Sequence, residues 1–449
     1  MALSTPHDSW SGAVNHEITV REYARLTTTD VRPTLDGAKI SPSAFRWVCQ
    51  CSENLRASGA PLVQIESREW LRLDNYVGVL ETSCGTRIEI LPKHVDAGDD
   101  IDRARQLLIR MLEGALDLPA KEVGPAALHT FRVPIREWLM SRFLLALDQL
   151  VKRGMRFIYH RVEEERRFLR GRLEIAKQIR RPPGRQHMFD LQHDVFDPNR
   201  PENRLLRLAL DRVCHLTRDP TNWRIARELD TYLSPIPPSQ HIGEDFRHWQ
   251  HDRLMAYYKG VKPWCELILN EQFPMTVSGQ WQGLSLLFPM EKLFERYVGD
   301  CLRRRLASTA TVVSQAARQH LCRHGESDWF ELRPDLLISR GSQNWILDMK
   351  WKRLNQTLKT TKFKYSISQE DMYQMFAYGQ RYLNGKGQMV LIYPKTKDFS
   401  KTLPEFEFSK DLKLWAVAFD LEKGAIVEDG LPEYLKPVLG LAPWADSVN

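Results

Sequence analysis

The sequence ELRPDLLISRGSQNWILDMKW, residues 331–351, decides the fold of the C-terminal part of the chain. Its two apolar runs flank the turn-like sequence SRGS at 339–342. A two-residue loop that begins with glycine suits a type II′ β-turn between antiparallel strands. We therefore expect a β-hairpin with Gly341 and Ser342 at its tip, and in that register Asp335 faces Asp348.

The proposed register can be checked at every other residue, because side chains alternate between the two sides of a strand. One side is apolar and pairs Leu332 with Trp351, Pro334 with Met349, Leu336 with Leu347, and Ile338 with Trp345. The opposite side carries Arg333, Asp335, Asp348, Lys350 and Lys352. The apolar side is expected to pack into a core and the polar side to carry chemistry.

Two carboxylates that face each other across a hairpin repel unless a cation lies between them, since opposed Cβ atoms are only ~4.5 to 5.5 Å apart. Carboxylate oxygens suit Mg²⁺, which retains several water ligands. We expect Asp335, Asp348 and the backbone carbonyl of Met349 to bind Mg²⁺. Lys350 would orient an attacking water and neutralise developing charge. The alternative is a plain cross-strand ion pair without metal.

Composition and charge are those of an ordinary soluble protein. The 449 residues are 43% hydrophobic and 27% charged, and the net charge of +7 is compatible with a polyanionic partner. No apolar run approaches the ~20 residues of a membrane helix, and no signal peptide begins the chain, so a cytoplasmic location is expected. Seven cysteines, an odd number, argue against a disulfide framework.

The pattern of apolar residues divides the chain into three segments, a multi-domain α+β protein overall. Residues 1–125 read as a small β-rich module with one helix, and residues 126–275 as a mainly helical segment. Residues 276–449 read as helix, three strands, helix and strand, which is an α/β layout.

A projecting hairpin with a basic tip is expected inside the helical segment. The sequence between residues 166 and 197 reads as two strands around RRPPGR at 180–185. Arg180, Arg181 and Arg185 are candidates for contact with phosphate or with an acidic partner surface. The alternative is a solvated loop.

The hairpin at 331–351 resembles the catalytic hairpin of the PD-(D/E)xK nuclease superfamily. The motifs FPMEKLFERYV, RPDLLI, ILDMKWK and DMYQMFAYG make the chain similar to the McrC family, the nuclease subunits of McrBC modification-dependent restriction systems. ITVREY, YVGVL and IEILPK add weaker support. This resemblance implies a C-terminal restriction-endonuclease-like domain with Asp335, Asp348 and Lys350 as catalytic residues.

The resemblance also implies a partner and further site residues. McrC-like proteins bind a McrB-like AAA+ GTPase ring through their N-terminal part and stimulate its GTP hydrolysis. The resemblance therefore implies a hetero-oligomer that acts on modified double-stranded DNA. Gln374 and Tyr378 share one helix face. In the family such a pair lies beside the metal, supporting DNA and the lysine, and Glu295 would add an acid. The alternatives are that Gln374 and Tyr378 cap a core edge and that Glu295 is solvated.

A basic connection follows the hairpin. Its members are Lys352, Arg353, Lys359, Lys362 and Lys364. Such a segment beside a metal-bound phosphodiester would add salt-sensitive DNA affinity, although charge runs are usually solvated surface. The sequence contains no GxxxxGK[ST] phosphate-binding loop, so any motor must be another polypeptide.

These observations favour a Mg²⁺-dependent DNA endonuclease subunit of an NTP-driven restriction complex that cleaves methylcytosine-containing DNA and stimulates its AAA+ partner. One alternative is a non-cleaving adaptor that activates the partner and uses a nuclease-like domain as a DNA clamp. Another is a stand-alone repair nuclease that cuts without a partner.

Overall fold

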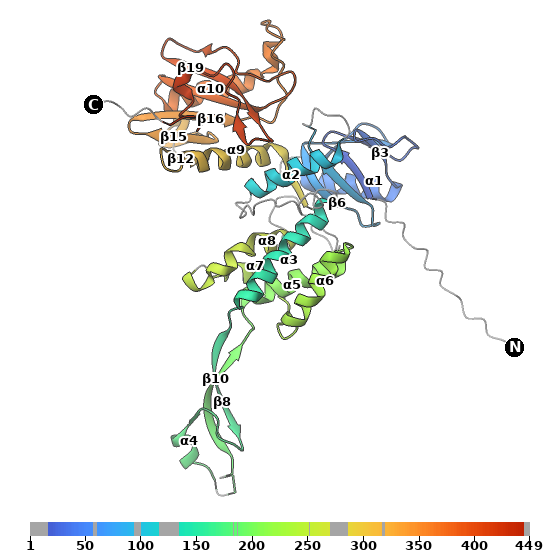
Figure 1. Cartoon of the computed structure of the whole chain (residues 1–449), viewed down its shortest axis with the longest axis vertical. Coiled ribbons are helices and arrows are strands. Elements are labelled where there is room, and N and C mark those ends of the chain that lie inside the picture. Colours follow the sequence, from blue (N-terminus) through green and yellow to red (C-terminus); the bar gives the residue numbers. More distant parts are fainter. Residues whose placement is uncertain are drawn as a thin grey trace, which may run out of the picture. The chain divides into compact units, whose positions relative to one another are not determined.

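The computed structural model describes residues 17–56, 61–93, 100–115, 134–182, 184–185, 187–250, 252–269, 286–316 and 319–443 (Figure 1). The chain forms two compact units, of which the first comprises Met1–Ile135 with Phe273–Asn449 and the second Arg136–Gln272. Within the described residues, no helix combines the length and apolar character needed to cross a membrane.

Two small sheets and two helices form the N-terminal part of the first unit. One sheet has the strand order β1-β7-β6-β11 and the other β3-β2-β5-β4. Their elements are β1 (Glu17–Arg21), β2 (Arg25–Thr27), β3 (Gly37–Lys39), α1 (Pro42–Arg56), β4 (Val63–Ile65), β5 (Trp70–Leu73), β6 (Tyr76–Glu81), β7 (Arg87–Leu91), α2 (Ile101–Ala115) and β11 (Leu286–Pro289). Apolar residues from both sheets and from α1 share one core. The β-rich character predicted for this part is confirmed, but it contains two helices, α1 and α2, where the sequence predicted one.

Strand β11 belongs to this N-terminal sheet although it lies two hundred residues further along the chain. It pairs antiparallel with β6, with Leu287 opposite Gly78. Gly78 has φ +127°, and a Cβ there would lie 2.0 Å from the carbonyl oxygen of Leu286. Only glycine permits so close an approach of the two backbones. Helix α9 (Met290–Leu306) follows β11 directly and leads into the C-terminal sheet.

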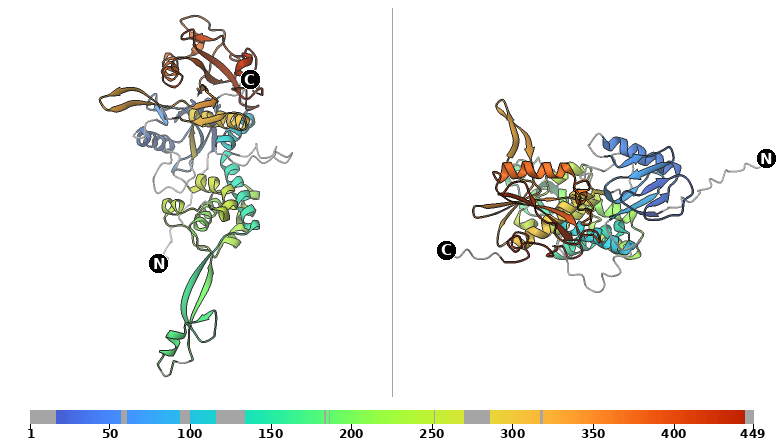
Figure 2. Two further views of the ribbon diagram at one scale, coloured as in Figure 1. Left: turned by 90° about the vertical axis from the view of Figure 1, so that its left-hand side faces the viewer. Right: turned by 90° about the horizontal axis from the view of Figure 1, so that it is seen from above.

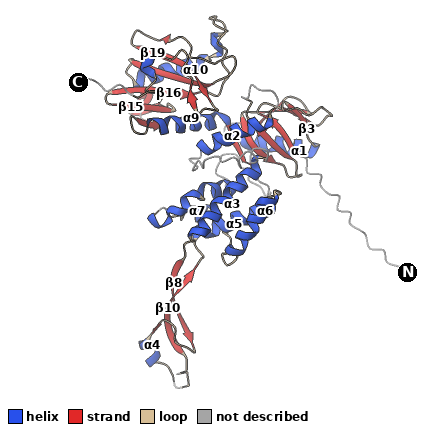
Figure 3. Ribbon diagram, in the orientation of Figure 1, coloured by secondary structure: helices blue, strands red, loops and turns tan. Residues whose placement is uncertain are grey.

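Helices make up most of the second unit, apart from one long hairpin (Figure 3). The helices are α3 (Ile135–Arg153), α5 (Pro201–Leu216), α6 (Pro220–Leu233), α7 (Ile242–Arg247), η2 (Arg253–Gly260) and α8 (Lys262–Leu269). Helix α5 begins at Pro201, as predicted, because proline has no N–H to lose in the first turn. The hairpin contains β8 (Ile158–Arg166), β9 (Arg172–Leu173), α4 (Ile175–Ile179) and β10 (Phe189–Asp197).

The hairpin exists, but the predicted position of its first strand is wrong. Strand β8 pairs with β10 from Ile158 opposite Asp197 to Arg166 opposite Phe189. The strand therefore ends where the sequence reading placed its start, and residues 175–179 form a short helix. IYHRVEEER is largely polar and none of its described side chains is fully buried, so its sequence shows no clear alternation of apolar and polar residues.

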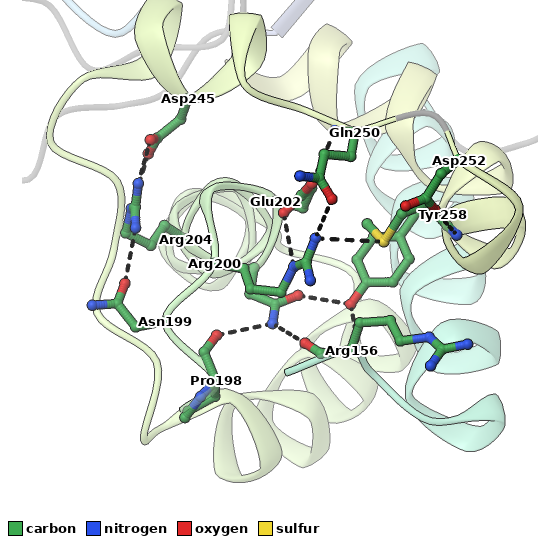
Figure 4. Close-up of polar contacts among 12 residues, drawn as sticks. Arg156, Pro198, Asn199, Arg200, Glu202, Arg204, Asp245, Gln250, Asp252 and Tyr258 are labelled. Atoms are coloured by element: carbon green, nitrogen blue, oxygen red, sulfur yellow. Dashed lines mark hydrogen bonds and ion pairs between the residues drawn. The ribbon is translucent and has the colours of Figure 1, made fainter. Parts of the chain in front are cut away.

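Both strands of the hairpin are held at their root by one buried polar network (Figure 4). The amide Nδ2 of Asn203 donates to the carbonyl of Arg156 at 2.8 Å and to that of Pro198 at 2.9 Å. Tyr258 accepts the N–H of Arg156 at 2.9 Å and donates to Oδ1 of Asn203 at 2.8 Å. Asn203 has no exposed surface. One side chain thus joins α5 to both ends of the hairpin.

Replacing Asn203 by alanine should lower the free energy of unfolding by about 3 kcal/mol, because two backbone carbonyls lose a hydrogen-bond donor and the buried hydroxyl of Tyr258 loses its acceptor. Asn199→Ala is the matched control, since exposed Asn199 offers its side chain only to Arg204. That variant should lose less than about 1 kcal/mol. Urea unfolding measures both, and equal losses would contradict the assigned importance of Asn203.

A seven-stranded sheet forms the C-terminal part of the first unit. Its strand order is β12-β15-β16-β17-β19-β18, with β20 added beside β19. The elements are β12 (Thr311–Ser314), β13 (Gln319–His324), β14 (Ser327–Leu332), β15 (Leu336–Arg340), β16 (Gln343–Met349), η3 (Lys364–Ser366), α10 (Gln369–Tyr382), β17 (Gly387–Pro394), β18 (Phe406–Glu407), β19 (Leu412–Asp420), β20 (Ala425–Ile426) and η4 (Glu433–Leu435). The expected α/β layout is confirmed, and β16, β17 and β19 run parallel.

One additional hairpin, β13–β14, separates β12 from β15 and was not predicted. It forms its own two-stranded sheet, and Figure 2 shows it (gold-orange) extending away from the neighbouring elements in both views. Trp329 and Phe330 on β14 are exposed. Residues His320, Cys322 and His324, which the sequence places on one strand face, lie on β13.

Candidate active site

The register of the central hairpin is the predicted one. Leu336 lies opposite Leu347, Ile338 opposite Trp345, and Arg340 opposite Gln343. Gly341 at the tip has φ +56°, whereas Ser342 is not among the residues with positive φ, which is the combination expected in a type II′ turn.

The predicted pairing of Leu332 with Trp351 is wrong. Leu332 lies on β14 opposite Gln319, and the ladder between β15 and β16 ends at the pair Leu336–Leu347. The predicted pairs Pro334–Met349 and Asp335–Asp348 therefore lie beyond the ladder. Pro334 has no N–H to donate, which is consistent with a ladder that begins only after it.

Helices cover both sides of this hairpin, so its polar residues are confined to one end. Gly299 of α9 lies against Leu336 and Met349 on one side. Leu337 and Ile346 on the other side share a core with Met375 and Tyr378 of α10. The predicted polar side is therefore apolar along most of its length. Its charged groups gather at the carboxyl end of β16, where Asp335, Asp348 and Lys350 lie.

Asp335 is held in place by the backbone of the opposite strand and by Gln315. Its Oδ2 accepts the N–H of Met349 at 2.7 Å, and its Oδ1 accepts the side-chain amide of Gln315 at 3.2 Å. Burial, together with the nearby carboxylates of Asp348 and Glu295, raises the pKa of Asp335 well above its ordinary value. In the metal-free protein this carboxyl group therefore releases its proton at a higher pH than an ordinary aspartate does.

Asp348 is only 1% exposed and carries an unsatisfied oxygen. Its Oδ2 lies 2.7 Å from Nζ of Lys350, an ion pair, yet accepts no hydrogen bond of acceptable geometry. Burial raises the pKa of Asp348 above its ordinary value, although the ammonium group of Lys350 acts in the opposite direction. A buried carboxylate in this state is stabilised by additional positive charge.

Lys350 links the acidic pair to α10. Its Nζ donates to Oε1 of Gln374 at 2.8 Å, and Nε2 of Gln374 donates to the hydroxyl of Tyr378 at 2.8 Å. Tyr378 in turn donates to the carbonyl of Arg333 at 3.0 Å. Burial disfavours the charged lysine, but Asp348 outweighs it and raises the pKa of Lys350. The ammonium group thus stays charged in a fixed position.

Gln315, which the sequence reading missed, joins two acids of the site. Its side-chain amide donates to Glu295 on α9 and to Asp335, and its N–H donates to the carbonyl of Asp335 at 3.0 Å. Gln315 adopts φ +48°, which is uncommon for a residue with a side chain. Glu295 is thus within reach of Asp335, as its position on α9 suggested.

The donor set fits a hard divalent cation. Among the described residues no group of three or more His, Cys, Asp or Glu side chains could hold a metal, so a cation here would rely on two carboxylates, backbone carbonyl and water. Mg²⁺ is bound in this sparse way. The unsatisfied oxygen of Asp348 and the raised pKa of Asp335 are both relieved by such a charge.

The basic connection after β16 is only partly available to a ligand. Lys352 donates to both carboxylate oxygens of Asp371 at 3.0 Å, and Asp371 lies in the first turn of α10. Arg353, Lys359, Lys362 and Lys364 are exposed. Tyr378 is 3% exposed and both bonds of its hydroxyl are internal, so the geometry gives it a role in holding Gln374.

The three arginines predicted to contact phosphate or a partner, Arg180, Arg181 and Arg185, differ in environment. Arg181 forms ion pairs with Asp190 at 2.6 Å and Glu165 at 2.7 Å, within the hairpin itself. Arg180 and Arg185 are exposed near the same turn. Only these two present their side chains outward.

The chain is similar to a known protein family and to solved structures. The family model described as "McrBC 5-methylcytosine restriction system component" matches residues 71–394. No curated protein matches. A chain in the Thermococcus gammatolerans assembly of McrB AAA+ hexamers with bound McrC has a TM-score of 0.70 at 19% identity, covering 91% of this chain and 95% of that one. A chain in the cryo-EM structure of the same organism's McrBC complex has a TM-score of 0.53 at 20% identity, covering 65% and 88%. At these identities the structures show a shared fold.

Proposed function

The chain belongs to the McrBC 5-methylcytosine restriction system component family, and from this premise we propose that it is the DNA-cleaving subunit of such a system. The reaction is hydrolysis of a phosphodiester in methylcytosine-containing double-stranded DNA, with Mg²⁺ as cofactor. The observation that carries the proposal is the pair of half-buried Asp335 and buried Asp348 with Lys350 beside it.

In this proposal Asp335, Asp348 and the carbonyl of Met349 hold Mg²⁺. When bound, the ion supplies positive charge that balances the two carboxylates and polarises a water and the phosphodiester. Hydrolysis adds the water oxygen to phosphorus, breaks one P–O bond, and leaves a proton on the departing oxygen. Gln315 holds Asp335 through two hydrogen bonds, one to its carboxyl group and one to its backbone carbonyl.

Lys350 supplies a fixed charge to the reaction. Its ammonium group is held between Gln374 and Asp348, and its raised pKa keeps it protonated. A protonated lysine donates hydrogen bonds to the phosphoryl oxygens as negative charge develops on them. It is not suited to remove a proton from water. The exposed cations Arg353, Lys359, Lys362 and Lys364 add backbone affinity for DNA beside the site.

The partner is a McrB-like AAA+ GTPase ring, which the chain binds in a hetero-oligomer and stimulates. This part of the proposal is supported by the family and by the fold shared with a chain of the assembly of McrB AAA+ hexamers with bound McrC. Partner contacts fall before residue 275. Exposed Arg180 and Arg185, near the end of the β8–β10 hairpin, are candidate contacts with an acidic surface.

Cleavage of long methylated DNA by the purified chain, its AAA+ partner, GTP and Mg²⁺ tests the proposal, with unmethylated DNA as the control. The expected result is double-strand cutting of methylated DNA and faster GTP hydrolysis. An adaptor would accelerate hydrolysis without cutting, and a stand-alone nuclease would cut without the partner. Either result would overturn the assignment.

Mg²⁺ affinity should rise with pH, because the raised pKa of Asp335 leaves a proton on this carboxyl group that the cation must displace. Isothermal titration between about pH 6 and about pH 9 should show affinity that increases and then levels off above the pKa of Asp335. Glu295→Gln removes one neighbouring carboxylate, lowers that pKa, and should move the plateau to lower pH. Affinity independent of pH would contradict the proposed ligand.

A further inference from the structure

Glu22 is a buried carboxylate in the N-terminal part of the first unit. It follows β1 directly, is 1% exposed, and lies in a turn in which the next residue, Tyr23, adopts φ +63°. Its N–H donates to the carbonyl of Leu91, and its Oε1 accepts the N–H of Lys93 at 2.8 Å. These bonds fix Glu22 to the ends of two adjacent strands, β1 and β7.

The second partner of this carboxylate comes from the C-terminal sheet. The indole Nε1 of Trp351 donates to Oε1 of Glu22 at 3.2 Å and to Oε2 at 3.1 Å, across 329 residues of sequence. Trp351 is 8% exposed, and its ring packs against Phe294 of α9 with centroids 5.3 Å apart. Trp351 is the residue immediately after Lys350.

We propose that Glu22 is a positioning residue for the nuclease site, acting through Trp351. The inference rests on the proposed function for its catalytic consequence. Glu22 touches no reacting group, and its role is to fix the backbone just beyond β16. There the N–H of Lys350 donates to the carbonyl of Ile392 at 2.9 Å, and the lysine side chain reaches Asp348 and Gln374.

Burying a carboxylate at this point costs desolvation free energy. Burial raises the pKa of Glu22 to about 7, against the lowering effects of the bonds from Lys93 and Trp351. Packing between α2 and α9 and the continuous β11–α9 connection already hold the two parts of the unit together. The hydrogen bond to Trp351 therefore adds local positioning of a catalytic strand rather than general adhesion.

Three variants test this role. Glu22→Ala and Trp351→Phe each remove the indole bond, whereas Glu22→Gln keeps Oε1, which accepts from both Lys93 and Trp351. In the complex with partner, GTP and Mg²⁺, the first two should lower kcat for DNA cleavage about tenfold with little change in KM. Glu22→Gln should restore most of it, and the Glu22→Ala, Trp351→Phe double variant should fall no further than either single variant.

Glu422→Gln is the matched control. Glu422 forms an exposed ion pair with Arg103 of α2 between the same two parts of the unit, away from the site. It should leave kcat unchanged. A fall in kcat shared by the control, or wild-type kcat in folded Glu22→Ala and Trp351→Phe, would overturn the inference.

Hydrogen exchange at the backbone N–H of Lys350 supplies the readout that does not depend on catalysis. Exchange should be faster in Glu22→Ala and Trp351→Phe than in the wild type, and close to wild type in Glu22→Gln and Glu422→Gln. Unchanged exchange would refute the positioning role whatever the cleavage result. If exchange responds as expected but the wild-type complex cuts no DNA, the positioning role stands and the nuclease assignment fails.

Discussion

Replacing Asp348 by asparagine is expected to lower Mg²⁺-dependent DNA cleavage about a thousandfold, which corresponds to about 4 kcal/mol of transition-state stabilisation. The substitution keeps the shape of a side chain that is 1% exposed but removes the charge that would bind the cation. It also removes the ion pair with Lys350. Stimulation of the partner's GTP hydrolysis should persist, because the docking residues are proposed to lie before residue 275.

Asp328→Asn provides the control for this experiment. Asp328 is an exposed carboxylate on β14 that pairs with Arg323 at 3.7 Å. The same change of chemistry there should leave cleavage within about twofold of wild type, as surface substitutions usually have small effects. Undiminished cutting by Asp348→Asn would remove this residue from the reaction.

Lys350→Met is expected to lower kcat about a hundredfold while the protein still binds Mg²⁺. Methionine replaces the ammonium group but keeps much of the apolar stem that packs in the site. Without this cation beside Asp348 the carboxylate pair is more negative, so Mg²⁺ affinity should stay equal or increase. Single-turnover cleavage and isothermal titration separate the two effects.

Lys386→Met serves as the control, because Lys386 is exposed and forms only a 3.7 Å pair with Asp411. A Lys350→Met variant that loses Mg²⁺ binding together with activity would contradict a purely electrostatic role. In that case the lysine would be needed to build the metal site rather than to stabilise developing charge.

The parts of the fold that were predictable are those where local sequence and tertiary packing agree. The hairpin register followed from the alternation of apolar residues around Gly341, and strands β17 and β19 followed from uninterrupted apolar runs. In these strands the apolar residues that become buried form a recognisable pattern in the local sequence. The assembly of Asp335, Asp348 and Lys350 at one end of the hairpin followed from the same register.

The parts that were missed depend on partners distant in sequence or lack apolar faces. None of the described side chains of β8, β13 and β14 is fully buried, so no hydrophobic pattern marks these strands. The predicted pair Leu332–Trp351 failed because β14 continues through Leu332 and pairs it with Gln319. Gln315 and Glu22 are an ordinary glutamine and glutamate in sequence. Their importance arises only when folding brings them to Asp335 and Trp351.

The proposed cleavage reaction requires one divalent cation shared by two aspartates. Anomalous diffraction from crystals of the protein soaked in Mn²⁺, a redox-quiet substitute with similar oxygen preference, would locate that ion. The expected result is an anomalous peak in contact with the carboxylates of both Asp335 and Asp348. Bound Mn²⁺ that touches neither aspartate, or only one of them, would contradict the account.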